Sequence, residues 1–63
     1  MNSADDLVYD INSTLRIWRE DIQYKESAKK EMLEQGNIKE AVKLDLQITA
    51  IQDCINDIEA VLW

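Results

Sequence analysis

The chain has 63 residues with 13 acidic and 7 basic side chains, a formal net charge of −6, no histidine, no proline, one glycine and one cysteine. Its length allows a single domain over residues 1–63, and it is shorter than the roughly 70–80 residues at which one core usually suffices for stability. Because it lacks histidine and has a single cysteine, the sequence excludes an ordinary zinc site and the usual general base at neutral pH. We therefore expect no cofactor, no metal and no enzymatic activity.

Three features bear on where the protein acts. No apolar run approaches the roughly 18 residues of a membrane helix. The first residues are acidic, unlike the basic start of a signal peptide. A lone cysteine suits a reducing compartment. We expect a protein of the cytoplasm, either of the cell that encodes it or of a host cell, without a membrane partner.

The first predicted helix spans about residues 4–34. Apolar residues follow one another from Ala4 to Ile22 at alternating spacings of four and three. This is the period of about 3.5 residues that is typical of a coiled-coil seam. Ser3 and Asp6 have the spacing of a capping box, and acidic residues suit the positive end of a helix dipole.

The turn is predicted at Gln35–Asn37. Gly36 is the only glycine and can adopt the left-handed conformation that ends a helix. Asn37 is a good N-cap, and Glu40 completes an Asn-x-x-Glu capping box for the next helix. The signals that end one helix and begin the next therefore coincide here.

The second predicted helix spans about residues 38–62. Its seam runs from Ala41 to Leu62 at spacings of three and four, and every seam position is apolar. This seam is out of phase with the first, so one continuous helix is disfavoured. The sequence thus predicts an all-α fold, an antiparallel two-helix hairpin, with Ile11 beside Leu62 and Trp18 beside Cys54 or Ile55.

Two helices cannot cover all the apolar residues of this chain, so we expect two hairpins to dimerise into a four-helix bundle. The first helix is the longer one and overhangs at its N-terminus, where Leu7 and Val8 lack cover from the second helix. The alternative is a monomer, since single exposed apolar residues are common. The residues expected in the core of the oligomer are Leu7, Val8, Ile11, Leu15, Trp18, Ile22, Leu44, Ile48, Ile51, Ile55, Ile58 and Leu62.

Charge predicts the orientation of the two hairpins. Residues 1–15 and 44–63 together carry seven acids and no base, whereas residues 16–43 carry all seven bases and six acids. An antiparallel homodimer sets each acidic open end beside the lysines of the other loop half, so we favour that form, although each surface pair is worth only about 0–1 kcal/mol. The alternative is that the acidic end binds a basic partner or a weakly held divalent cation.

Other chemistry-bearing residues have simpler interpretations. Asp6 with Asp10, and Asp53 with Asp57, are stacked one turn apart, and we interpret both pairs as parts of a solvated face. Cys54 flanks the second seam, where a cysteine usually behaves as a small buried hydrophobe.

The two-helix layout with a Gly-Asn turn resembles the plasmid-encoded RNA-binding hairpins of the Rop type, which dimerise antiparallel. In the turns that correspond to that family's RNA-binding stripe the chain has Asp10, Thr14 and Trp18, so RNA binding is not carried over. The layout is also similar to the hairpin aspartyl-phosphate phosphatases of sporulating bacteria. Residues 45–49 stand in place of that family's Ser-Gln-x-Leu-Asp run and lack its Ser and its key Asp.

The favoured function is a non-enzymatic protein-interaction module, an acidic oligomeric hairpin that regulates or inhibits a macromolecular partner. Free-standing acidic hairpins of this size are often regulators or inhibitors, including those encoded by phages and mobile elements, which is an association and not a physical argument. The candidate partner-binding residues are Tyr9, Ile17, Tyr24, Val42 and Leu46. Two alternatives remain: a nucleic-acid-binding hairpin, which a net charge of −6 disfavours, and a purely structural oligomerisation element.

Overall fold

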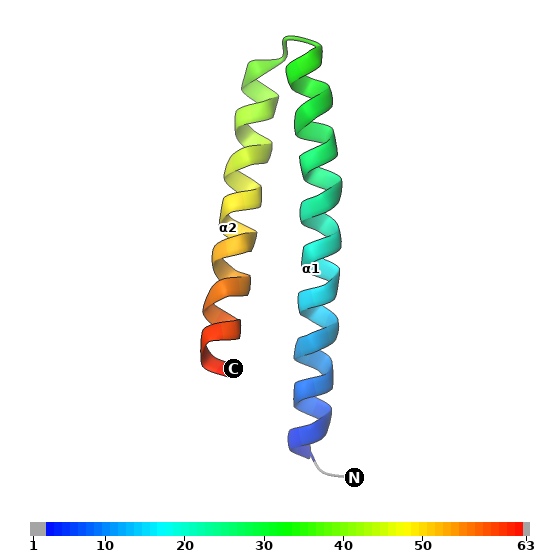
Figure 1. The fold of residues 1–63 in the computed structure, drawn as a ribbon, viewed down its shortest axis with the longest axis vertical. Helices are drawn as coiled ribbons and strands as arrows, with labels where there is room; N and C mark the ends of the chain where they lie inside the picture. The colour runs from blue at the N-terminus through cyan, green and yellow to red at the C-terminus, as the bar shows by residue number, and fades with distance from the viewer. Residues whose placement is uncertain (1–2, 63) are drawn as a thin grey trace.

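The structure is a computed structural model that describes the backbone of residues 3–62 and the side chains of residues 6–62. It consists of α1 (Ser3–Glu34) and α2 (Ile38–Leu62), which pack side by side and antiparallel as a helical hairpin (Figure 1). The predicted fold class and helix bounds are confirmed. The hairpin measures 52 × 18 × 13 Å, and α1 extends past the end of α2 at the open end (Figure 1).

The turn ends α1 with a Schellman motif. Gly36 has a φ of 77°, a left-handed conformation that glycine adopts without strain. The Gly36 N–H donates to the Leu33 carbonyl oxygen at 3.1 Å, and the Asn37 N–H donates to the Met32 carbonyl oxygen at 2.8 Å. Two carbonyl groups that the helix end would leave unpaired are satisfied in this way.

Asn37 also caps α2, but the predicted capping box is only half formed. Its side-chain Oδ1 accepts a hydrogen bond from the Glu40 N–H at 3.4 Å. The reciprocal bond, from the Asn37 N–H to the Glu40 carboxylate, is not formed because this N–H donates to the Met32 carbonyl oxygen instead. The Glu40 carboxylate instead pairs with Lys43 Nζ at 3.3 Å. The predicted Ser3–Asp6 box depends on the Ser3 side chain, which lies outside the described side chains.

The core follows the two predicted seams. Its most buried side chain is Ile55, which has no exposed surface, and Leu15 retains 2%. Packing between the helices, rather than the middling helix propensity of isoleucine, therefore holds this region in place. The other buried apolar residues are Ile22 and Ala41, and those packed partly buried against the cluster are Ile11, Trp18, Ile48, Ile51 and Ile58.

Four of the residues expected in the core lie at its margin in the single chain. Leu44 and Leu62 are half-buried. Leu7 and Val8 are exposed because they lie on the part of α1 that extends past α2, as the unequal helix lengths predict. No side chain among residues 6–62 covers them.

Candidate interaction surface

The hairpin has two broad faces, one on each side of the plane that contains both helix axes. On one face two ion pairs join the helices. The Arg19 guanidinium pairs with the Glu59 carboxylate, and Lys29 Nζ lies 2.8 Å from Asp45 Oδ1. We call this surface the ion-paired face, and it includes Gln52, which lies midway between the two acids on the same side of α2.

The opposite surface, which we call the groove face, has two shallow apolar grooves between the helices. Trp18, Ala50, Ile51 and Cys54 line the groove near the middle of the hairpin.

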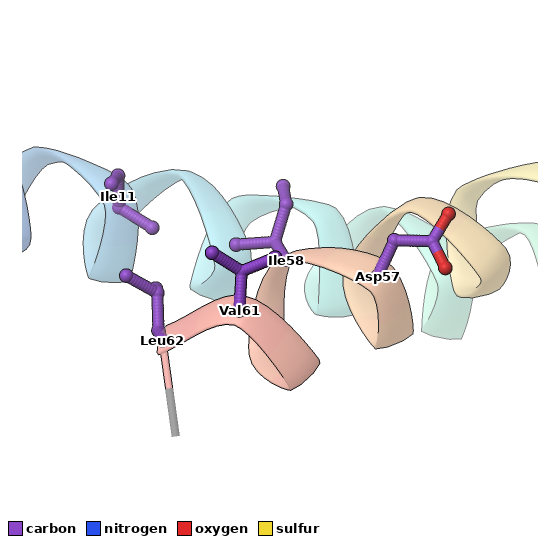
Figure 2. A pocket seen from close by; sticks show the side chains of 5 residues that line it. All are labelled: Ile11, Asp57, Ile58, Val61 and Leu62. Atoms are coloured by element: carbon purple, nitrogen blue, oxygen red, sulfur yellow. The ribbon is translucent and has the colours of Figure 1, made fainter.

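The second groove lies at the open end and is lined by Ile11, Ile58, Val61, Leu62 and Asp57. Figure 2 shows the Ile11 side chain on α1 pointing toward Leu62 on α2, with Val61 between Leu62 and Ile58. The Asp57 carboxylate points away from these apolar side chains, at the rim (Figure 2). Both grooves match the hairpin register predicted from the sequence.

Helix geometry explains why the two faces differ. Asp45 and Cys54 are nine residues apart, which is two and a half turns of an α-helix, so they project to opposite sides of α2. Residues seven apart return to nearly the same side. The stripe through Asp45 therefore continues to Gln52 and Glu59, whereas the stripe through Cys54 continues to Val61.

The prediction that Cys54 is buried is wrong for the single chain, because its thiol is free and exposed. Cys54 lies beside the α2 seam rather than on it, and it lines a groove whose α1 side is Trp18. An apolar side chain at this position is exposed unless another molecule covers it.

The five candidate partner-binding residues are all exposed, from 52% for Val42 to 75% for Tyr24. They do not form one surface. Ile17 and Tyr24 are two turns apart on the outward side of α1, and Val42 and Leu46 are one turn apart on the outward side of α2. Since the helices lie side by side, these two pairs project away from each other. Tyr9 lies near the open end, on the α1 segment that extends past α2.

Three residues of the groove face were not among the candidates: Ala50, Cys54 and Val61. Val61 is 86% exposed, the most exposed of the large apolar side chains. The signal that could have found them is their phase, because each lies next to the α2 seam on the side opposite the acidic stripe.

Two further ion pairs lie within the helices. Lys25 pairs with Asp21, as expected from their spacing, and Lys43 pairs with Glu40. The corresponding pair of Glu26 with Lys30 is not formed. Within residues 6–62 no three acidic or cysteine side chains come together as metal ligands. Neither α1 nor α2, over the residues described, contains an apolar stretch long enough to cross a membrane.

Comparison with protein-family models, with curated proteins and with solved structures finds no match to this chain. Its two faces and its charge distribution are therefore the basis for inferring what it does.

Proposed function

We propose that the chain is a non-enzymatic protein-interaction module, a small acidic hairpin that forms a homodimer and binds a macromolecular partner to regulate or inhibit it. One observation carries this proposal: among residues 6–62, ten large apolar side chains are exposed, while four apolar residues are buried. Single exposed apolar residues are normal, but larger exposed apolar surfaces mark interaction sites.

The exposed apolar residues divide into two groups with different roles in this proposal. Those on the groove face, together with Leu7 and Val8 on the extended part of α1, become covered by the second copy. Those on the outward sides of the helices, such as Tyr24 and Leu46, remain for the partner. Tyrosine and large aliphatic side chains are typical of the buried centres of interfaces.

Nucleic-acid binding is the less favoured function because the bases are largely occupied. Four of the seven are ion-paired within the hairpin, namely Arg19, Lys25, Lys29 and Lys43. A phosphate would have to compete with these carboxylates on a chain with a net charge of −6. The free thiol of Cys54 supports a reducing compartment, the cytoplasm of the cell or of a host.

The proposed binding of a partner is tested by affinity capture, with this protein as bait, from a lysate of the organism that carries the gene. Leu46→Asp is expected to lose the captured protein while keeping its helical circular dichroism, because Leu46 is 66% exposed. Gln52→Asp is the matched control on the same helix and should still capture it. The proposal is overturned if the wild type captures no protein reproducibly, or if substitutions at all five candidate residues leave capture unchanged.

A further inference from the structure

We infer that the groove face is where a second copy of this chain docks, antiparallel, with the twofold axis at the level of Trp18 and Cys54. This inference rests on the homodimer of the proposed function, and it adds which face forms the interface, how the two copies are oriented and in which register they pack. Both apolar grooves lie on this face, and both ion pairs that join the helices lie on the other. A second copy on the groove face therefore covers apolar surface without displacing these pairs.

The register follows from the stripes that border the groove. Leu7, Thr14, Asp21 and Ala28 share one side of α1, because they are seven residues apart. A twofold axis perpendicular to the helices places α1 antiparallel to the other α1, and α2 antiparallel to the other α2. With the axis at Trp18, Leu7 of one copy is level with Ala28 of the other, and Thr14 is level with Asp21.

The axis crosses α2 at the same level, because Trp18 and Cys54 line one groove. The two Cys54 side chains then face each other across the axis. Two Trp18 side chains also meet near it. The axis therefore lies over the apolar groove in the middle of the hairpin.

If one copy is shifted by seven residues so that the axis lies nearer the loop, the same stripes of α1 and α2 still face each other. This second register places like charges closer together. It would bring the two Asp21 carboxylates together at the axis and two Ala50 side chains together on α2. It would also set Leu7, which is 60% exposed, level with Gln35 in the turn, beyond the end of α1 in the second copy. The register at Trp18 covers Leu7 and separates the like charges.

Charge complementarity supports the same register. In this register Asp10, near the open end of α1, is level with Lys25 of the second copy. A parallel dimer would instead place two open ends side by side, each of which carries seven acids and no base.

The size of the face is also sufficient. The hairpin is 52 Å long and 18 Å wide, and a stable interface of standard size covers about 800 Å² on each partner. The α1 helices overlap along nearly their whole length in this register, so nearly the full length of the face is used.

The first test is thiol crosslinking with a short bis-maleimide, after sedimentation equilibrium has shown a dimer. The wild type, whose only thiol is Cys54, is expected to crosslink to a covalent dimer. Two variants in a Cys54→Ala background serve as matched comparisons and are expected not to crosslink. Gln52→Cys has its thiol on the ion-paired face, and Gln35→Cys has it beside the loop.

Each other outcome overturns a stated part of the inference. Crosslinking through Gln52→Cys refutes the face, and crosslinking through Gln35→Cys refutes the antiparallel orientation. If Cys54→Ala with Ala50→Cys crosslinks while the wild type does not, the register is the one a heptad away. In these three cases the dimer of the proposed function stands. A wild type that sediments as a 7.3 kDa monomer overturns the dimer itself. If that monomer still captures a partner protein, the proposed binding of a partner stands.

A charge reversal tests the register independently. Asp10→Lys is expected to weaken the dimer about fivefold at low salt, and the loss should shrink at high salt because exposed charges are screened. Asp53→Lys makes the same change in net charge on the outward side of α2 and should leave the dissociation constant within about twofold. Equal effects of the two variants would overturn the register.

Discussion

The two faces of the hairpin join the same pair of helices by different means. On the ion-paired face, Arg19 with Glu59 and Lys29 with Asp45 span the helices, and these side chains remain from about one third to one half exposed. The charged groups of this face are both paired and hydrated, and each exposed ion pair is worth about 0–1 kcal/mol. On the groove face no ion pair among residues 6–62 joins the helices, and the apolar side chains that line the grooves are exposed to water.

The difference comes from the residues beside the seam, since both faces share one core. One stripe of α2 is Asp45, Gln52 and Glu59, and the stripe on the other side includes Cys54 and Val61. A seam needs only two apolar residues in each heptad to join two helices. The stripe on the Cys54 side is apolar only toward the open end, since Gln47 and Glu40 continue it toward the loop. Its apolar part is not needed to join two helices, and it suits the packing of a third and fourth helix against the first two.

The largest effect on stability is expected from a substitution in the core that both faces share. Ile55→Asp places a carboxylate where the wild-type side chain has 0% exposure. Burial of a charge without a partner, added to the lost packing, should destabilise the protein by more than about 4 kcal/mol. Helical circular dichroism at 222 nm should be lost. Leu46→Asp is the control on the same helix and should keep the wild-type spectrum.

The next effect separates the two faces directly. Cys54→Glu and Gln52→Glu introduce the same charge two residues apart on α2, one on each face. The first should weaken dimerisation by about 3 kcal/mol, because it buries an unpaired carboxylate in the interface. The second should change it by less than about 0.5 kcal/mol. Sedimentation equilibrium measures both, and equal dissociation constants would show that the groove face is not the interface.

A smaller effect is expected in the turn, which belongs to neither face. A Cβ at Gly36 would meet nothing within 4 Å, so Gly36→Ala introduces no clash. Its φ of 77° nonetheless costs an L-residue about 1 kcal/mol. Urea denaturation should show that loss, and Gly36→Asn should lose less. If alanine is neutral, the left-handed conformation of residue 36 is not required for the turn.

The smallest effect is expected on the ion-paired face. Lys29→Ala removes the pair with Asp45, whose side chain is 53% exposed, and should destabilise the hairpin by at most about 1 kcal/mol. The loss should decrease further above about 0.5 M salt, since exposed charges are screened there. A loss as large as that of a core substitution would mean that this face contributes far more than its exposure indicates.

The fold could be predicted from the sequence because its signals are local and agree with one another. The seam periods gave both helices, and Gly36 with Asn37 gave the turn. The capping box could not be predicted in full, because the Asn37 N–H has a single hydrogen to donate and the end of α1 already uses it. Local motifs that overlap on one residue compete, and the sequence pattern does not indicate which one prevails.

The candidate surface could be predicted only in part. Exposure of Tyr9, Ile17, Tyr24, Val42 and Leu46 follows from their distance to the seams, but their division between opposite sides of the hairpin needs both helix phases at once. Ala50 and Cys54 were overlooked because small side chains give a weak hydrophobic signal. Their place beside the seam, rather than their size, makes them part of the groove face.

The double use of Asn37, as the last residue to close α1 and the first to cap α2, also bears on how the chain folds. A connection of three residues between the helices loses little chain entropy on closing, and helix turns form in well under a microsecond. The two helices can therefore form and pack progressively from Gly36 toward the open end, and the extended part of α1 makes its contacts last. Encounter of two folded hairpins is then the slow step, so the refolding rate should rise with protein concentration.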